Sequence, residues 1–305
     1  MNQEQIIERF SNLNVGRSSG QRAPHKPLLL LVVIAKFQEG KTILSFDEIE
    51  EALSPLLATY APPVKKPDPK LPYWHLQSDQ LWEIEGAEAL PRQMGGFPKM
   101  AGLRRSSARL PESVIQCLRS DPALIEKIVK ILLFEHFPES LHEDILATVG
   151  LSFSSGFNSK EAEGTYTTTK KRDPKFRENV LRAYEHQCAL TGFRAALAGN
   201  FFACEAAHVQ WHAFDGPDSV DNGLCLEPTM HKLFDAGAWS LSDDRRVLVS
   251  ANFTGSDFAI QRLRTLHGQS IRSPLAGHPE VSPEYIRWHR ERQLGGVFRE
   301  PALPL

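Results

Sequence analysis

The sequence has no apolar run of about 18 residues, the length a helix needs to cross a membrane. Its most apolar stretch, PLLLLVVIAKF, starts at Pro27 and is too short to span a bilayer. The amino-terminal stretch MNQEQIIERFSNL is charged and amphipathic, and it lacks the apolar centre of a signal peptide. These absences predict a cytoplasmic protein with no membrane partner.

Cysteine is also scarce. The chain has four, Cys117, Cys188, Cys204 and Cys225, and no two of them form a CxxC pair, which argues against a zinc ribbon. A disulfide framework is not expected in an intracellular chain of this size, so we predict free and partly buried thiols. No internal repeat is present.

Charge of one sign is not in excess, because the net charge is only −2. The basic residues are nevertheless clustered. Residues 17–41 hold five Lys or Arg and one acid, residues 91–110 hold five and none, and residues 170–182 hold six and two. Local basic segments matter more than the total charge for binding phosphates, although many such segments are simply solvated surface.

A chain of 305 residues is longer than one core usually organises, so two domains are expected. Residues 1–150 are predicted to form a mainly helical domain, and residues 151–171, rich in Ser, Thr and Gly, a flexible linker. The helices are expected at 2–13, 25–40, 45–60, 111–120 and 121–137, with two short strands around a turn in 71–86.

Residues 172–305 are predicted to form a second domain, which makes the fold class α+β. A capped helix is expected over 173–192, followed by a strand over 201–211, a turn at DNG and a strand over 224–228. A short helix over 229–237 and a hairpin over 239–250 follow.

The stretch EAAHVQWHAFDGPDSVDNGLCLEPTMHKLFDAG, residues 205–237, carries the chemistry. His208 ends a predicted strand, Asn222 lies at the turn, and His231 lies in the short helix. A strand–loop–strand–helix of this length brings strand and helix residues face to face, so one divalent ion can sit between them. His208 could then deprotonate a water, His231 could ligate the ion, and Asn222 could bond backbone across the loop. DNG is also an ordinary hairpin turn.

The pattern AAHVQW…GPDSVDNGL…HKLFDAG resembles the signature of the HNH nucleases, which have the ββα-metal fold, over about Phe176 to Ser250. FRENVLRAYEHQCALTG resembles the segment that precedes it in bacterial restriction-type HNH proteins. The resemblance implies that His208 is the general base, Asn222 the central asparagine and His231 the metal ligand. It implies a catalytic divalent metal, Mg²⁺ or Mn²⁺.

Some positions depart from the pattern. Many HNH nucleases have Asp or His directly before the base, where this chain has Ala207. Glu205 is the nearest acid and the candidate second metal ligand, but an ideal strand would point it away from His208 unless a bulge intervenes. His212 is a loop residue that could add a ligand or a phosphate contact. Met230 stands where some relatives have a second histidine.

In the first domain, RSSGQRAPHKPLLLL (17–31) and PYWHLQSDQLWEIEG (72–86) resemble the sulfur-binding domain of phosphorothioate-dependent type IV restriction endonucleases, which join it to a carboxy-terminal HNH domain. A sulfur atom on a phosphate is larger and less hydrated than oxygen, so a small apolar pocket between cations would favour it. By resemblance Phe97, Pro98 and Ala101 form this pocket. The other candidate DNA contacts are Arg22, His25, Lys26, His75, Lys99, Arg104 and Arg105.

The sequence therefore predicts a restriction endonuclease that recognises phosphorothioate-modified double-stranded DNA and hydrolyses phosphodiester bonds with one divalent metal. One HNH site cuts one strand, so double-strand cleavage would need a homodimer or two binding events. Two alternatives stay open at this point. One is an HNH nuclease specific for methylated or unmodified DNA, and the other is a non-catalytic reader of modified DNA.

Overall fold

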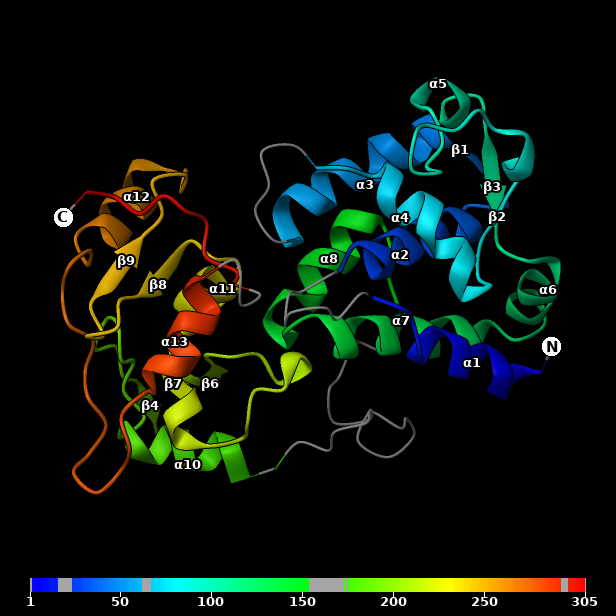
Figure 1. Ribbon diagram of the computed structural model, residues 1–305. Helices are drawn as coiled ribbons and strands as arrows, with labels where there is room; N and C mark the ends of the chain where they lie inside the picture. The colour runs from blue at the N-terminus through cyan, green and yellow to red at the C-terminus, as the bar shows by residue number, and fades with distance from the viewer. Residues whose placement is uncertain are drawn as a thin grey trace. The chain divides into compact units, whose positions relative to one another are not determined.

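The computed structural model describes residues 2–15, 24–61, 67–153, 173, 175–291 and 296–304. The chain divides into two compact units, one mainly within residues 1–153 and the other mainly within residues 173–305. Helices dominate, and the strands of the described residues form small antiparallel sheets (Figure 1). This composition confirms the predicted α+β class. The predicted linker, residues 151–171, lies outside the described residues apart from 151–153.

The amino-terminal unit is a helical cluster around one apolar helix, α2. Its first four helices are α1 (Gln3–Ser11), α2 (His25–Gln38), α3 (Phe46–Tyr60) and α4 (Lys70–His75). The remaining helices are α5 (Met100–Leu103), α6 (Glu112–Ser120), α7 (Pro122–His136) and α8 (His142–Val149). Ten consecutive residues of α2, Lys26–Ala35, are buried, because α3, α4, α7 and α8 all pack against it (Figure 1).

A three-stranded sheet lies beside these helices. Its strands are β1 (Ile43–Ser45), β2 (Glu83–Ile84) and β3 (Ser107–Arg109), in the order β1-β3-β2. Ala108 pairs with Leu44 on one side and with Ile84 on the other, and all three residues are buried. Only β2 comes from the segment in which strands were expected.

The prediction of two short strands in residues 71–86 is wrong for the first half of the segment, which forms α4 and the 3-10 turn η2 (Leu76–Asp79). Pro69 precedes α4 and Pro72 lies in its first turn, where a missing N–H costs no hydrogen bond. Tyr73 then packs edge-on against Phe46 and Trp82, at ring-centroid distances of 5.0 and 5.8 Å. This packing favours the helix over a strand.

The carboxy-terminal unit has the predicted strand–turn–strand–helix order, but the helix expected over 173–192 ends at Ala183 and is followed by a hairpin that was not predicted. It begins with α10 (Lys175–Ala183), the hairpin β4 (Ala196–Leu197) and β5 (Asn200–Phe201), and the strand β6 (Glu205–His208). Next come the 3-10 turns η5 (His212–Phe214) and η6 (Val220–Asn222), β7 (Gly223–Leu226) and α11 (Pro228–Asp235). The last elements are β8 (Trp239–Leu241), β9 (Val247–Val249), α12 (Asp257–Arg264) and α13 (Pro283–Arg290).

Helix α10 packs tightly on the β6–β7 pair. Gly223 lies opposite His208 in the register, and a Cβ atom at Gly223 would stand 2.4 Å from Val180 Cγ2 and 3.2 Å from Phe176 Cε2. Only glycine therefore lets α10 approach the end of the hairpin this closely. Gly237, at φ +76°, ends α11 in the left-handed conformation that the predicted helix stop requires.

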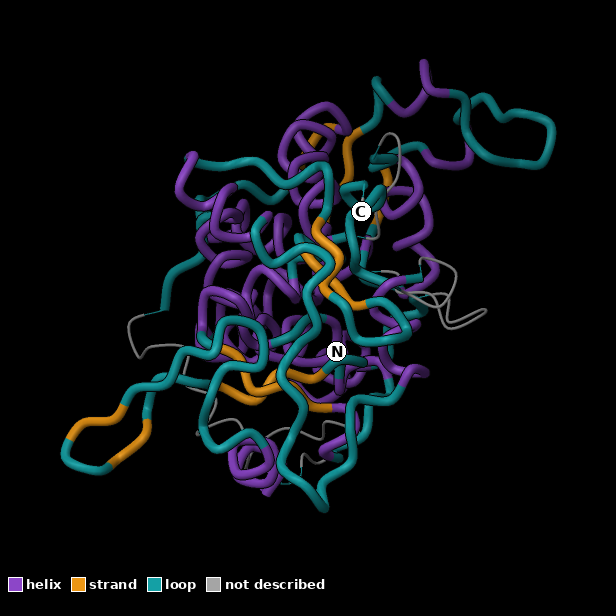
Figure 2. The backbone as a smooth tube through the Cα atoms, turned by 90° about the vertical axis from the view of Figure 1, so that its left-hand side faces the viewer, coloured by secondary structure: helices purple, strands orange, loops and turns teal. Residues whose placement is uncertain are grey.

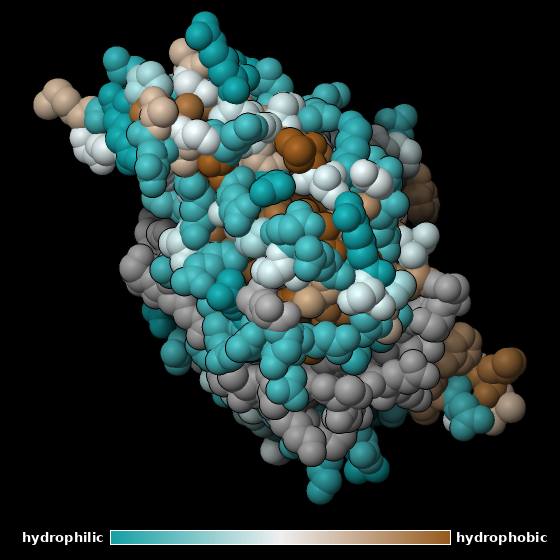
Figure 3. Space-filling model, turned by 90° about the vertical axis from the view of Figure 1, so that its right-hand side faces the viewer, coloured by the Kyte–Doolittle hydropathy of each residue, from teal (hydrophilic) through white to brown (hydrophobic). Residues whose placement is uncertain are grey.

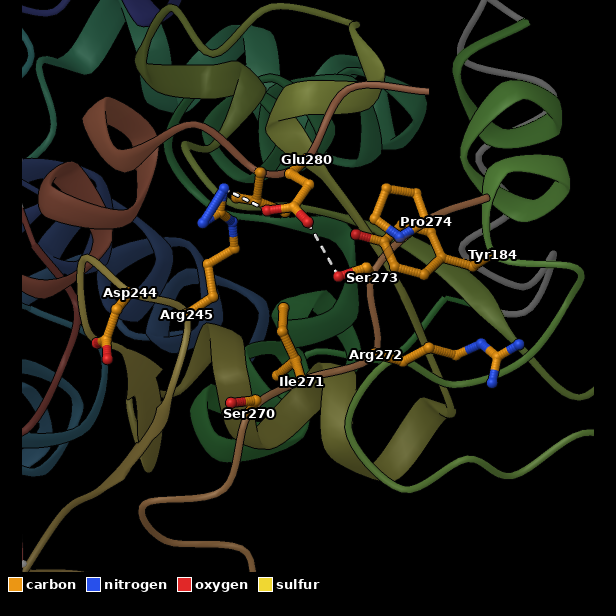
Figure 4. A pocket seen from close by; sticks show the side chains of 10 residues that line it. Tyr184, Asp244, Arg245, Ser270, Ile271, Arg272, Ser273, Pro274 and Glu280 are labelled. Carbon is orange, nitrogen blue, oxygen red and sulfur yellow. Dashed lines mark hydrogen bonds and ion pairs between the residues drawn. The ribbon is translucent and has the colours of Figure 1, made fainter. Parts of the chain in front are cut away.

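The face shown in Figure 3 is mainly hydrophilic with small apolar areas, as expected for units whose apolar residues are buried. One pocket of the carboxy-terminal unit is lined by Tyr184, Arg245, Arg272 and Glu280 (Figure 4). There Glu280 forms an ion pair with Arg245 and accepts a hydrogen bond from Ser273 at 3.0 Å, so the charges of this pocket largely compensate one another.

Candidate active site

Strands β6 and β7 and helix α11 together position the predicted catalytic residues. The strands pair without interruption from Glu205↔Leu226 to His208↔Gly223, which places His208 at the end of the ladder. Pro228 starts α11 directly after β7, and His231 follows in its first turn. His208 and His231 line the same hollow. The structure thus brings together the two histidines that the sequence spacing predicts to face each other.

His208 is held by a carboxylate that the sequence analysis did not identify. Its Nε2 lies 2.7 Å from Oδ1 of Asp218, and its ring stacks on Phe176 at a centroid distance of 3.8 Å. A carboxylate only accepts hydrogen bonds, so Nε2 carries the proton and Nδ1 is the basic nitrogen. The geometry therefore selects one tautomer of His208.

Asp218 is itself fixed in place. Its Oδ2 accepts a hydrogen bond of 2.5 Å from the backbone N–H of Asp173. Burial by itself would raise the pKa of Asp218, but the hydrogen bonds from His208 and Asp173 outweigh burial and hold that pKa below its usual value. His212 Nε2 lies 3.9 Å from Oδ2 of Asp218. Asp218 is therefore a fixed carboxylate rather than a mobile surface group.

Asn222 is fully buried and makes the cross-loop hydrogen bonds expected of it. Its Oδ1 accepts from the backbone N–H of Gln210 at 2.8 Å, and its Nδ2 donates to the carbonyls of Gln210 and Pro217, both at 2.9 Å. Gly216 passes so close that a Cβ there would stand 1.8 Å from the Gln210 carbonyl oxygen. Asn222 therefore ties both ends of the loop between His208 and Asp218.

His231 lies between two carboxylates. Its Nδ1 is 2.8 Å from Oε2 of Glu205, and its Nε2 is 3.2 Å from Oδ2 of Asp235, four residues further along α11. Burial alone would lower the pKa of His231, but Asp235 and then Glu205, through charge and hydrogen bonding, raise it to about 9. Both ring nitrogens carry protons in this arrangement.

Glu205 reaches His231 although β6 contains no bulge. It is the first residue of the strand, and its three-carbon side chain turns toward α11. The hydrogen bond from His231 lowers the pKa of Glu205 against the opposing effect of burial. The expectation that only a bulge would bring Glu205 to the site is therefore wrong. Ala207 and Met230 (2% exposed) are both buried in the core. Neither position therefore supplies a ligand for a metal ion.

The donors around His231 fit a divalent ion in chemical type. Carboxylate groups suit Mg²⁺ and Mn²⁺, whereas imidazole is a common ligand of transition-metal ions, and Mg²⁺ is usually held by one or two carboxylates with water and phosphate completing its shell. Asp235, which also accepts from Trp211 Nε1 at 2.9 Å, is placed to orient His231 through Nε2. No group of three or more His, Cys, Asp or Glu is arranged as a ready metal cluster within the described residues.

Asp218 and Asp235 were missed by the sequence analysis. Asp235 had a usable signal, because residues four apart on a helix share one face and His231 lies four positions earlier. Asp218 had a weaker one, since it lies ten residues after His208 in a loop whose path no periodicity predicts.

In the amino-terminal unit, the segment predicted to bind sulfur is a compact loop. Phe97 is half-buried, with its ring 6.1 Å from that of Trp74 and 5.9 Å from that of His75. Pro98 is buried, whereas Ala101 is exposed on α5. Arg92 stacks over Trp74, with its Cζ 5.3 Å from the ring centroid. Aromatic rings and exposed cations thus meet at this loop.

The predicted cationic contacts fall into different groups. Lys99 and Arg105 are exposed and form no ion pair with any described residue. Arg104 is paired with Asp47 (2.7 Å) and Glu50 (2.9 Å). His25 is half-buried at the start of α2, and Arg22 lies outside the described residues.

The environment of Lys26 differs from that predicted for a DNA contact. Its ammonium is buried and lies 2.5 Å from Oδ2 of Asp79, and it donates to the carbonyl of Asn14 at 2.7 Å. The adverse position of this cation at the start of α2 is therefore compensated inside the domain. A bound phosphate is not needed to explain it, and the ammonium does not face solvent.

No helix among the described residues combines the length and the apolarity that crossing a membrane requires.

Two family models match the chain. Residues 3–154 match the ScoMcrA-like DNA sulfur-binding domain, and residues 188–242 match the HNH endonuclease family. The second match contains His208, Asn222 and His231, and the first contains Phe97, Pro98 and Ala101. A search of curated proteins found no match.

Several solved structures are similar to the chain. A sulfur-binding domain of ScoMcrA complexed with phosphorothioated DNA is 27% identical, with a TM-score of 0.42, over 48% of this chain and 94% of that one. The type IV phosphorothioation-dependent restriction endonuclease ScoMcrA is 27% identical, with a TM-score of 0.38, over 47% of this chain and 32% of its own. The modification-dependent restriction endonuclease TagI is 26% identical, with a TM-score of 0.31, over 43% and 41%.

The chain thus covers about a third of that ScoMcrA endonuclease structure, although it covers nearly all of the isolated domain. Each of the two family matches names one domain. The chain carries a ScoMcrA-like DNA sulfur-binding domain over residues 3–154, followed by a domain of the HNH endonuclease family over residues 188–242.

Proposed function

We propose that the protein is a restriction endonuclease that binds phosphorothioate-modified double-stranded DNA and hydrolyses phosphodiester bonds nearby. The observation that carries this proposal is the presence in one chain of a DNA sulfur-binding domain and an HNH domain. The two catalytic histidines of the second domain lie at one hollow, and this arrangement supports hydrolysis as the outcome of binding.

In the proposed reaction His208 acts as the general base. Asp218 holds the proton on Nε2, so Nδ1 takes a proton from the attacking water, and the carboxylate stabilises the imidazolium that forms. Stacking on Phe176 limits rotation of the ring. Asn222 acts through the backbone, because it fixes the loop that carries Asp218 relative to the strand that carries His208.

Glu205 and His231 would hold a divalent metal ion, Mg²⁺ or Mn²⁺. The ion would act as a Lewis acid that stabilises negative charge on the phosphate and on the leaving oxygen. His231 must lose one proton to serve as a ligand. Asp235 accepts from Nε2 and so leaves Nδ1, the nitrogen beside Glu205, as the donor to the ion.

The test compares three matched duplexes, phosphorothioate-modified, methylated and plain, with Mg²⁺ or Mn²⁺ present, and measures binding and cutting together. We expect preferential binding and cutting of the phosphorothioate duplex. Equal binding to all three would contradict sulfur recognition, while selective binding without cutting in either metal would contradict catalysis.

Asp218→Asn is expected to lower the cleavage rate at least about tenfold, because the amide no longer fixes the tautomer of His208 or stabilises its protonated form. The pH profile separates this role from a structural one. A variant lacking the carboxylate should show a lower apparent pKa on the acidic limb, where cleavage rises with pH, since it loses a charge that favours imidazolium. An unchanged profile with a lower rate would indicate only a folding defect.

The stability of the metal-free protein should fall as pH rises. The pKa of His231 is raised from 6.5 to about 9 in the folded state, so its stabilising effect is fully present below pH 6.5 and is lost as pH rises through 9. We expect the melting temperature in EDTA to fall over this interval. The melting temperature of His231→Gln should fall less over the same interval. An equal fall in both proteins would contradict the assignment of this pH dependence to His231.

A further inference from the structure

The β4–β5 hairpin stands away from the rest of its unit and exposes both of its faces (Figure 2). Its turn uses Ala198 and Gly199, both at positive φ (49° and 80°), which gives a tight two-residue connection. An isolated two-stranded hairpin gains little stability by itself. Four large apolar side chains on and beside it are exposed: Phe193 47%, Leu197 74%, Phe201 40% and Phe202 66%.

Two basic side chains support this hairpin from its own unit. The His186 ring stacks on Phe201 with centroids 4.7 Å apart and an angle of 15°, and Arg194 places its Cζ 4.3 Å from the same ring. His186 and its neighbour Glu185 both have positive φ, 57° and 53°. Two adjacent non-glycine residues in this region cost stability, so the fold retains strain where His186 meets the hairpin.

The surroundings of the hairpin are cationic, and their charge is only partly neutralised within the described residues. Residues 186–204 contain no Asp or Glu. Burial and then the charges of Arg194, Arg177 and Arg182 lower the pKa of His186, which reports the positive potential at this place. Arg182 is paired with Glu178, but Arg177 and Arg194 form no ion pair with any described residue. Two arginines are therefore available to an anionic partner.

The hairpin also adjoins the candidate active site along the chain. Phe202 is three residues before Glu205, and β6 then leads to His208. Arg177 donates to the carbonyl of Cys204 at 3.3 Å and contributes to the lowered pKa of Glu205. A polymer held by the hairpin would thus pass close to the reacting phosphate.

We propose that the β4–β5 hairpin with Arg177, His186 and Arg194, here called the basic arm, binds duplex DNA beside the scissile phosphate. Arg177 and Arg194 contact backbone phosphates, while Leu197 and Phe202 contact sugars and bases in the groove. This inference rests on the proposed function, because it assigns the arm to the DNA that the HNH site cuts. Cations position a duplex without reading sequence, and apolar side chains inserted at base steps strengthen the hold.

A second copy of the chain is the other conceivable occupant, and charge disfavours it. In a two-fold symmetric interface the same patch meets itself. Arg177, His186 and Arg194 of one copy would then face the same residues of the other, with no acid in residues 186–204 to separate them. DNA supplies the opposite charge at regular spacing.

The test measures the affinity of the full chain for an unmodified duplex across salt concentrations, the cleavage rate and the sedimentation coefficient. Arg194→Gln removes one cation, and Arg194→Lys keeps the charge. Leu197→Ser with Phe202→Ser removes two exposed apolar groups without touching the core. The matched control is Phe258→Ser with Arg264→Gln on α12, where Phe258 is equally exposed at 74%.

Arg194→Gln should lower the slope of log affinity against log salt by about 1, while Arg194→Lys and the control keep the wild-type slope. The double serine variant should lose about tenfold in affinity and in kcat/KM. Wild-type binding and cutting in all variants would contradict a DNA-binding role of the basic arm while leaving the proposed function intact. A wild-type dimer that the double serine variant dissociates would overturn it in favour of self-association. If the wild type cuts no DNA but the slope still falls in Arg194→Gln, the proposed function and the place of the arm beside a scissile phosphate both fail, and only DNA binding by the arm stands.

Discussion

Replacing His208 with alanine is expected to lower the rate of DNA cleavage by about 10²- to 10⁴-fold, the usual contribution of a positioned general base. Affinity for a phosphorothioate duplex should stay within about twofold of the wild-type value, because the residues that match the DNA sulfur-binding domain lie in the other unit of the chain. The size of the effect follows from the geometry. Nε2 is committed to Asp218, so we expect Nδ1 to be the nitrogen that takes the proton.

The control for His208→Ala is His212→Ala. His212 lies on η5 with its ring centroid 5.9 Å from that of His208 and also faces Asp218, so it resembles His208 in environment but not in position on the strand. We expect His212→Ala to retain more than a tenth of the wild-type rate. His208→Gln, which keeps part of the side-chain volume against Phe176, shows whether lost packing accounts for the loss. Cleavage by His208→Ala above a tenth of the wild-type rate would refute the assignment of the base.

Metal binding separates the two histidines further. His208→Ala should bind Mn²⁺ with unchanged affinity, because the proposed donors are Glu205 and His231. His231→Ala should lose that binding together with cleavage. If His208→Ala instead weakened Mn²⁺ binding as much as His231→Ala, His208 would be a ligand rather than the base.

The parts of this site that the sequence predicts are those fixed by local structure. His208 ends a strand and His231 lies in the helix directly after the next strand, so pairing of β6 with β7 leaves little freedom in their placement. The cross-loop hydrogen bonds of Asn222 follow from its position next to β7. The same holds for α2, whose apolar run predicts a buried helix in any arrangement of its neighbours.

The parts that could not be predicted depend on contacts distant in sequence. Asp218 reaches His208 because the loop over residues 209–222 folds back on Asn222, and no residue pattern reports that path. The α4 segment, with its adjacent aromatic residues, reads as a strand, yet Tyr73 packs on Phe46 of another helix and on Trp82. Tertiary contacts decided both outcomes.

The buried ion pair of Lys26 with Asp79 also depends on a contact distant in sequence. Lys26→Met is expected to destabilise the amino-terminal unit by about 3–5 kcal/mol, because it leaves the Asp79 carboxylate buried and without its cation. The side chains of Lys26 and Asp79 are 10% and 3% exposed, so solvent cannot replace the lost partner. Urea unfolding of a chain in which Trp211, Trp239 and Trp288 are replaced by Phe, followed by the fluorescence of the remaining Trp74 and Trp82, measures the change.

A double variant distinguishes a structural cation from a DNA contact. Asp79 also accepts from the backbone N–H of Asn14 at 2.6 Å, so Asp79→Asn keeps that acceptor while removing the charge. Lys26→Met with Asp79→Asn should therefore recover most of the lost stability, since no unpaired charge stays buried. Its affinity for a phosphorothioate duplex should match the wild type, with the same salt dependence. A slope lower by about 1 in this stable variant would instead identify Lys26 as a phosphate contact that becomes exposed when DNA binds.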